Sequence, residues 1–473
     1  MPLQSALETS SVSSQNRVAG TLVYTAGGLL ILFLWLLFGD FAIAMRERAA
    51  VPSVMELLRQ HHASATTMSI LVVAFPAIIG LLLVPVVSFK SDRYRSDRGR
   101  RIPFLIIPTP IGAAAMVGLG FTPWLGTQLH HLLGQLSPGL DFCVLSFFCV
   151  FWTVFECVAV LTLAMFTALI NDVVPKGLLG RFFGLFRSIS LGAGIIFNYW
   201  IFKLTETHLM EIFVSIGLFF GLAFTLMCLM VKEGEYPAPE DTADDAAAQG
   251  FVAGAKTYFV ECFSQRYYRW AFAAIAIGTL APSPFNTFYQ WYAGNLGMPK
   301  ETLGKLSAYS YGVSIGLAYF IGWLVDRFNA LRVATGALLV YMTVMLCGYL
   351  MIHDVNSFGV FYVLHVVISG AYFTSAASLP MMLFPQMRFS QFASAAGMVT
   401  GLSTLAVSLV QGPVLDLNGN DYKLTLLGSS IFAALAVLLN FVVLRHQAPE
   451  PLSANANKLT GNPSLNNAAA EAA

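Results

Sequence analysis

The chain has 473 residues, of which 57% are hydrophobic and 11% are charged, and its formal net charge at pH 7 is +1. Soluble proteins carry about 25% charged residues, so this composition and a mean hydropathy of +0.70 exclude a soluble protein. They predict an integral membrane protein, and a net charge near zero argues against nucleic acid as a partner.

Apolar runs of about 20 residues, the length that crosses a bilayer as a helix, recur along the whole chain. Six precede a polar interruption and six follow it. We therefore expect an all-α membrane protein with twelve transmembrane helices in two six-helix halves. The predicted spans cover 22–44, 66–89, 102–121, 141–170, 178–202, 208–231, 270–293, 302–325, 332–351, 357–384, 390–415 and 423–444.

Polar segments divide the chain into five parts. The interruption begins with acidic residues mixed with Pro and Ala, which predicts a disordered linker. From Phe251 to Trp270 it mixes aromatic and basic residues, a composition typical of a helix at the membrane surface. The predicted parts are an N-tail (1–21), an N-terminal half (22–231), the interruption (232–269), a C-terminal half (270–446) and a C-tail (447–473).

The positive charges indicate how the chain is oriented. Of the 26 Lys and Arg residues, 18 fall on the side of the N-terminus, 7 on the opposite side, and Arg187 inside a predicted helix. Positive residues concentrate on the cytoplasmic side of membrane proteins. We therefore expect both termini in the cytoplasm and, in a bacterium, insertion in the inner membrane.

The most highly charged run in the chain connects the second and third predicted helices. It spans residues 91–104 and reads Ser-Asp-Arg-Tyr-Arg-Ser-Asp-Arg-Gly-Arg-Arg-Ile-Pro-Phe. Alone it would fit an ordinary basic cytoplasmic loop. About half a chain length further on, residues 322–332 again end an apolar segment with Asp-Arg and supply another arginine. Two such hairpins at equivalent places predict two homologous halves, as in transporters built from repeats.

The first hairpin carries a family resemblance. Asp92-Arg93 followed by Gly99-Arg100-Arg101 resembles the signature loop of the major facilitator superfamily. The longer form of the run resembles its sugar–cation symporter branch, which contains the glycoside–pentoside–hexuronide carriers and the sucrose transporters. The layout agrees with this fold from about residue 22 to about residue 446, but only the loops match residue by residue. The resemblance implies a secondary transporter that works by alternating access.

By this resemblance the charged loops form a latch that holds the inner gate shut while the cavity faces outward. Arginines there can bond carboxylates and helix-end carbonyls, and an aspartate can face a helix N-terminus. The second copy lacks the Gly-Arg-Arg segment, so we expect a weaker or differently partnered latch there. A further charged elbow follows the fourth helix. The predicted gating residues are Asp92, Arg93, Gly99, Arg100, Arg101, Asp172, Arg181, Asp326, Arg327 and Arg332.

Two acidic residues inside the predicted spans are candidate coupling sites, because ionisable groups in a membrane are costly and functional by default. Asp40 is expected toward the outer end of the first helix, and Glu156 near the middle of the fourth. Each can bind a proton or a sodium ion. The alternative for Asp40 is an interfacial residue paired with Arg46 or Arg48. Arg187 is a possible partner of Glu156, although the helix rise places it roughly 12 Å deeper.

Polar and aromatic residues on the seventh and tenth spans indicate a solute site. Four residues of the tenth lie on one helical face. In the seventh, amides alternate with aromatic rings, which suits a sugar because sugars have apolar faces and hydroxyl rims; the alternative is an interfacial aromatic belt. In the resembling fold, helices 1, 4, 7 and 10 line the cavity. The candidate substrate-binding residues are Trp152, Asn286, Tyr289, Gln290, Tyr362, His365, Ser369 and Tyr372.

The sequence contains no P-loop, dinucleotide fingerprint, Gly-x-Ser-x-Gly elbow or metal-ligand cluster. We therefore expect no enzyme activity, no cofactor and no metal site. The leading hypothesis is symport of a small neutral organic solute, a sugar or glycoside, with H⁺ or Na⁺, by a monomer in the lipid bilayer. The alternatives are a proton-linked exporter of amphipathic compounds and a non-transporting relative that serves membrane assembly or sensing.

Overall fold

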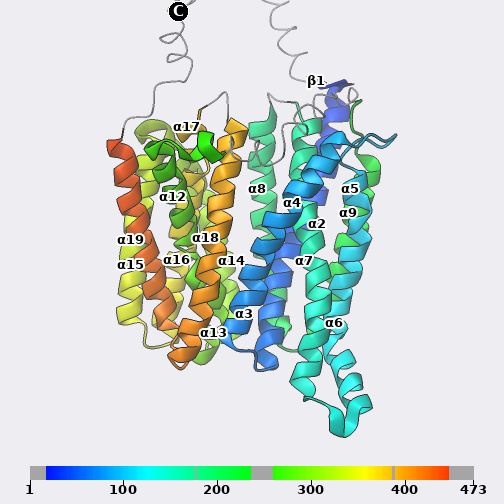
Figure 1. Cartoon of the computed structure of the whole chain (residues 1–473), viewed down its shortest axis with the longest axis vertical. Coiled ribbons are helices and arrows are strands. Elements are labelled where there is room, and N and C mark those ends of the chain that lie inside the picture. The colour runs from blue at the N-terminus through cyan, green and yellow to red at the C-terminus, as the bar shows by residue number, and fades with distance from the viewer. Residues whose placement is uncertain (1–17, 176–177, 236–258, 386–388, 447–473) are drawn as a thin grey trace, which may run out of the picture.

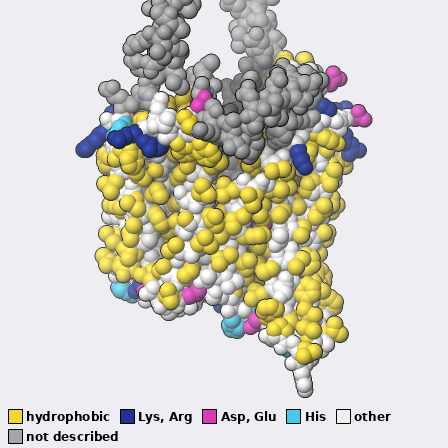
Figure 2. Space-filling model, viewed as in Figure 1, with side chains coloured by type: hydrophobic (Ala, Val, Ile, Leu, Met, Phe, Trp, Pro, Cys, Tyr) yellow, Lys and Arg dark blue, Asp and Glu magenta, His cyan; other side chains and the backbone are white. Residues whose placement is uncertain are grey.

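The structure, a computed structural model, describes residues 18–175, 178–235, 259–385 and 389–446. Its long helices run side by side in two groups, one from each half of the chain (Figure 1). Among the described residues, eleven helices are long and apolar enough to cross a membrane. Figure 2 shows a broad hydrophobic band across the face of the bundle in view, with Lys and Arg gathered near its upper rim. Such a band is the surface that a lipid-embedded protein requires.

The N-terminal half contains six spans, as predicted. A π-helical turn interrupts the second span, and the fifth ends in a π turn and a 3-10 turn. A short antiparallel hairpin of β1 (Val18–Ala19) and β2 (Leu22–Val23) precedes the helices. The helices are α2 (Ala26–Gln60), α3 (Ala65–Ser69), η1 (Ile70–Ala74), α4 (Phe75–Arg93), α5 (Pro103–Ile106), α6 (Pro108–Leu133), η2 (Gly134–Leu136), α7 (Leu140–Val173), α8 (Leu179–Ile196), η4 (Phe197–Ile201), η5 (Phe202–Glu206) and α9 (Leu209–Met230).

The C-terminal half repeats this arrangement in the other group of helices. Much of the predicted linker and of the predicted surface helix, residues 236–258, lies outside the described residues, as do both predicted tails from residue 1 to 17 and from 447 to 473. The helices of this half are α12 (Arg266–Leu280), α13 (Ser283–Asn295), α14 (Lys300–Phe328), α15 (Ala330–Met351), α16 (Val355–Ala376), α17 (Leu379–Leu383), α18 (Phe389–Leu417) and α19 (Lys423–Arg445).

The predicted seventh span is broken into α12 and α13, which follow one another from the upper to the lower part of the bundle (Figure 1). Pro282 and Pro284 cause the break, because a proline lacks the N–H of the helical ladder and its ring clashes with the preceding turn. The Phe285 N–H donates instead to the Ser429 hydroxyl of α19 at 3.4 Å. Non-helical backbone at membrane depth is tolerated where protein surrounds it in this way.

The first span continues far beyond its predicted end at residue 44, because α2 extends to Gln60. Arg46 and Arg48 therefore lie inside a long helix, and the predicted end of the span at residue 44 is too early. Arg46 is 1% exposed. Asp40, expected near an end of the helix, lies in its middle. The hydropathy pattern stops at these charges, whereas the helix continues because neighbouring helices bury Arg46, and Arg48 bonds Tyr311 of α14.

The two halves meet most closely at one end of the bundle. We call the end that carries loop 94–102 the latch face, and the end that carries His61 and the 134–139 loop the opposite face. Lys300 of α14 donates to Glu56 of α2 at 2.6 Å. Asp416 of α18 accepts the first N–H groups of α3, and a hydrophobic core cluster continues from one half into the other through the same region. The opposite face is therefore closed.

Candidate functional site between the two halves

Asp40, the first predicted coupling residue, is enclosed by protein. It is 2% exposed, and its Oδ2 atom has no hydrogen-bond partner among the described residues. Neither Arg46 nor Arg48 forms an ion pair with it in the described part of the chain. The alternative interpretation of Asp40 as an interfacial partner of these arginines is therefore wrong. A buried carboxylate without a donor is costly unless it binds a proton or another cation.

Glu156, the second predicted coupling residue, is 8% exposed in the middle of α7. The cation within its electrostatic range is Arg46, whose guanidinium carbon lies 5.8 Å from the Phe155 ring and 4.7 Å from the Phe220 ring. Arg46 also pairs with Glu47 at 3.5 Å. Sequence reasoning missed Arg46 because it lies on another helix and was assigned to a loop. Arg187, the possible partner of Glu156 in the sequence analysis, instead donates to Thr374 of the C-terminal half.

The four predicted residues of α16 are buried against other helices of their own half. The Tyr362 hydroxyl lies 2.7 Å from the Ser307 hydroxyl of α14. His365 joins Tyr341 of α15, 2.8 Å from Nδ1, to Asn286 of α13, 2.8 Å from Nε2. Because the Asn286 Oδ1 only accepts, His365 donates from Nε2 and receives the Tyr341 proton at Nδ1. Ser369 and Tyr372 are also buried, and whether this face meets solute stays a prediction.

Asn286 is the exposed member of this hydrogen-bonded chain. Its carbonyl oxygen is held by His365, which leaves its amide N–H groups to meet a solute. Beside it, Gln290 donates to the Tyr289 hydroxyl at 3.1 Å, and the Tyr289 ring stacks on Tyr362 with centroids 5.2 Å apart. The geometry thus places an amide and a tyrosine side by side on α13.

Trp152 of α7 is a packed core residue in this structure. It is 1% exposed, its indole N–H donates to the Leu71 carbonyl at 2.8 Å, and its ring lies between Phe148 and Phe155. It shares its helix with Glu156, one turn further on. Its predicted role in substrate binding remains a prediction.

Two arginines that sequence reasoning left out of the solute site reach from the N-terminal half to the C-terminal half. Arg48 of α2 donates to the Tyr311 hydroxyl of α14 at 3.0 Å. Arg187 of α8 is exposed and donates to the Thr374 hydroxyl of α16 at 3.3 Å. Since each bonds the C-terminal half, both arginines lie where the two halves meet. We call Arg48, Arg187, Glu47 and Asn286 together the interhalf site; the Glu47 side chain is 46% exposed.

The first latch loop is tied to its own half. Arg100 clamps the Asp172 carboxylate with two bonds, at 3.0 and 2.8 Å, and Arg101 adds a third at 3.2 Å. Glu233 accepts the backbone N–H groups of residues 100–102. Gly99 has φ +98, and a Cβ there would come within 2.5 Å of the Glu233 side chain. Glu233, expected in a disordered linker, is therefore part of the latch.

The described contacts of the second latch copy differ from those of the first. The Arg327 guanidinium lies 5.5 Å from the Trp323 ring and 5.6 Å from the Phe328 ring, and Arg332 is exposed in the first turn of α15. The side chains of the remaining predicted gating residues lie outside the described part of the structure. They are Asp92, Arg93, Arg181 and Asp326.

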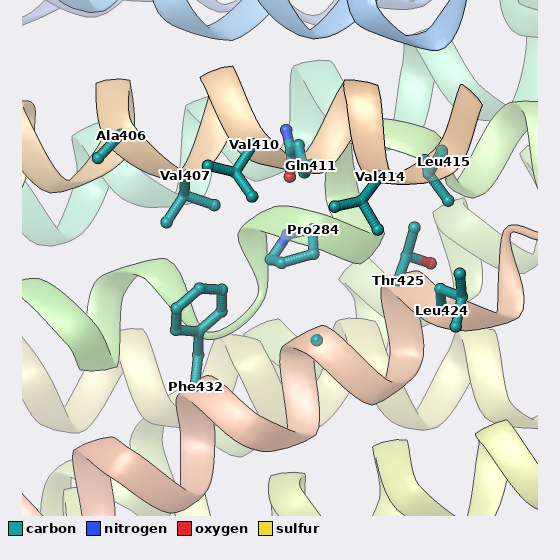
Figure 3. Close-up of a pocket in the computed structure, with 11 residues that line it drawn as sticks. Pro284, Ala406, Val407, Val410, Gln411, Val414, Leu415, Leu424, Thr425 and Phe432 are labelled. Atoms are coloured by element: carbon teal, nitrogen blue, oxygen red, sulfur yellow. The ribbon is translucent and has the colours of Figure 1, made fainter. Parts of the chain in front are cut away.

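A groove of about 380 Å³ lies beside the break between α12 and α13 (Figure 3). Pro284 lines it together with apolar side chains of α18 and α19. Gln411 is its main polar side chain, and the amide N–H of Gln411 donates to the Ser69 hydroxyl of the N-terminal half at 2.9 Å. An apolar lining of this kind suits lipid tails or helix packing, so the groove is not the polar site that the sequence predicted.

These features define a class: a multi-pass α-helical membrane protein whose two six-helix halves enclose charged residues and close at one face. A family model described as "Major Facilitator Superfamily" matches residues 36–408 and again residues 272–469. The chain belongs to the Major Facilitator Superfamily, a family of transporters. No curated protein matches it by sequence.

Solved transporter structures share the fold at low sequence identity. The nucleoside transporter NupG has a TM-score of 0.63 at 13% identity, covering 88% of this chain and 100% of its own. A D-xylose-proton symporter has a TM-score of 0.57 at 15% identity, covering 87% and 96%. A bacterial homolog of the human lysosomal transporter Spinster, in an inward-facing and unoccupied conformation, has a TM-score of 0.60 at 12% identity, covering 88% and 96%. These similarities establish the fold.

Proposed function

We propose that this protein is a cation-coupled symporter that moves a sugar or glycoside by alternating access. The observation that supports it most is the pair of buried acids, Asp40 and Glu156, in a bundle whose two halves bond each other at one face. A transporter has a use for such acids, since binding a proton or a sodium ion relieves their burial. A protein that only assembles or senses has no such use.

The proposed solute class follows from Asn286, Tyr289 and Gln290. Amide groups and tyrosine hydroxyls can satisfy sugar hydroxyls, while aromatic rings cover the apolar face of a sugar ring. The resemblance of the latch loop to the sugar–cation symporter branch agrees with this proposal. So do two structural neighbours, whose names contain D-xylose and nucleoside; both compounds contain a sugar ring.

Alternating access would require that one face of the bundle closes when the other opens. In this structure the opposite face is closed by Glu56–Lys300 and by Asp416 at the start of α3, while the latch residues Arg100 and Asp172 bond within one half. We propose that the latch face closes when the opposite face opens. Solute held at the interhalf site would then be released on the other side.

The test is uptake of labelled sugars by purified protein in proteoliposomes, with an imposed pH gradient, a sodium gradient or neither. Symport predicts accumulation that requires one of the two gradients in the same direction as solute. Efflux driven by an inward proton gradient would identify an exporter. The absence of any transport of sugars or amphipathic compounds, by protein shown to be folded, would favour the non-transporting alternative.

A further inference from the structure

Two cations of the interhalf site lack acidic partners. Within the described part of the chain, neither Arg48 nor Arg187 forms an ion pair, and each donates only to a neutral hydroxyl, that of Tyr311 or Thr374. Arg48 also packs against Gly194 of α8, two turns after Arg187 on the same helix, so the two like charges lie near each other and repel. Placing two such charges in the membrane interior without compensation is costly.

Two cations that the structure describes and that are largely shielded from solvent do have carboxylate partners. Arg46 pairs with Glu47, and Lys300 pairs with Glu56. Arg48 and Arg187 differ from both, and they are accessible rather than sealed in the core. An arginine that is accessible, unpaired and fixed by a neutral hydroxyl retains free N–H donors for a ligand.

Their position fits a ligand that touches both halves. Arg48 contributes from α2 and Arg187 from α8, while Tyr311 and Thr374 belong to α14 and α16 of the other half. Arg48 also lies within electrostatic range of the Tyr289 hydroxyl on α13. A ligand bound to the arginines would thus adjoin the residues that we assigned to sugar recognition.

We propose that the transported solute is an anion, and that Arg48 and Arg187 bind its oxyanion group, a carboxylate or a phosphate. Guanidinium groups bind both through paired, charge-assisted hydrogen bonds. This inference rests on the proposed transport function and replaces the expected neutral solute with a sugar-like compound that carries a negative charge.

The charges around the site explain how such a solute would be coupled to a cation. The two buried acids of the same half, Asp40 and Glu156, are where a proton or a sodium ion would bind. An entering anion adds a negative charge to the interior of the protein, and a cation bound at an acid offsets it. Because opposite charges attract strongly in a medium of low dielectric constant, each ligand favours the binding of the other, and the effect is reciprocal.

The experiment compares three probes that share one ring and differ at one carbon: D-glucose, D-glucuronate and D-glucose 6-phosphate. Binding is measured on the purified full chain in detergent by the shift in thermal unfolding and by titration calorimetry, without any gradient. The variants are Arg48→Gln and Arg187→Gln, with Arg48→Lys to retain the charge. Arg445→Gln, at an exposed position in the last turn of α19, is the matched control.

We expect one of the two anions to bind at least about tenfold more tightly than glucose, because charge-assisted hydrogen bonds exceed neutral ones by that amount or more. Which anion binds identifies carboxylate or phosphate. Arg48→Gln and Arg187→Gln should each remove this preference with the unfolding temperature unchanged. Arg48→Lys should retain part of the preference, and Arg445→Gln should retain all of it. Equal binding of glucose and both anions, no binding of either anion, or an anion preference that survives in both Gln variants would overturn the proposal.

Uptake into proteoliposomes separates this inference from the function on which it rests. Anion binding that depends on both arginines, without gradient-driven uptake, would contradict symport and leave the anion site intact. Gradient-driven uptake of glucose with no anion preference would support symport and overturn the anion site.

Discussion

At the scale of single residues, the structure links polar side chains that the sequence could only name separately. Asn286 and His365 were predicted as site residues, but their contact joins positions far apart in the chain, which no local spacing reveals. Tyr341 was not predicted at all, because an isolated tyrosine in an apolar helix gives no signal until its hydroxyl is seen to bond His365. Arg48 was missed for the related reason that it was placed in a loop.

Replacing Asn286 by Ala should weaken solute binding, since the amide is the exposed end of this hydrogen-bonded chain. The loss of one neutral hydrogen bond costs about 1 kcal/mol, which is about fivefold in affinity. The half-saturation concentration for exchange of labelled solute measures it. Asn356→Ala, an exposed change in the first turn of α16, should leave this value unaltered. Equal effects of the two changes would remove Asn286 from the site.

At the scale of helices, hydropathy predicted which segments span but not where they break or end. The α12–α13 break follows from two prolines whose effect the apolar run concealed. The length of α2 follows from burial of Arg46 against rings of other helices, which is tertiary information. The latch could be predicted in part. The sequence placed Arg100, Arg101 and Asp172 in gating loops, and the structure adds that the two arginines bond the aspartate.

Two aspartates cap helix N-termini in different ways. Asp354 caps α16 within its own chain segment, and bonds from Ser357 hold the pKa of this carboxyl below its ordinary value. At neutral pH this cap is fully charged; its contribution fades only as the pH falls below the ordinary aspartate pKa toward the lowered one. Asp416 lies in the C-terminal half and caps α3 of the N-terminal half, so its bonds also join the two halves.

Asp416→Asn should therefore open the opposite face, whereas Asp354→Asn should lower stability slightly without opening it. Losing a charge-assisted cap contact shifts the equilibrium between closed and open states by about tenfold. The readout is the labelling rate of a cysteine introduced at Ser69, which is buried beneath this contact, in a background without the native cysteines. Equal labelling in the two aspartate variants would show that Asp416 does not hold the closure.

At the scale of the whole molecule, the sequence predicted the twelve-span, two-half architecture because membrane spans need long apolar runs and repeated halves carry repeated loops. It could not predict which face is closed, because the closing contacts join residues from different halves. Glu56 and Lys300, 2.6 Å apart and both shielded from solvent, are the clearest case. Neither stood out in the sequence, where each is one charge near the end of an apolar segment.

Lys300→Gln should destabilise the closed opposite face, because it removes the cross-half cation from Glu56 and leaves Arg59 of the same helix as partner. Lys305→Gln is the matched control, since Lys305 pairs with Glu301 one turn away on its own helix. With one spin label on each half at the opposite face, the distribution of label-to-label distances should broaden toward longer values for Lys300→Gln alone. An unchanged distribution would place the closure elsewhere.

The central claim, that a cation bound at Glu156 drives solute accumulation, is tested most directly with Glu156→Gln in proteoliposomes. The amide resembles a protonated acid and cannot take up or release the cation. The account predicts that this variant still exchanges labelled solute across the membrane but no longer accumulates it under an imposed proton or sodium gradient. Accumulation at the level of the unaltered protein would contradict the claim, and Asp40 would then be the remaining candidate.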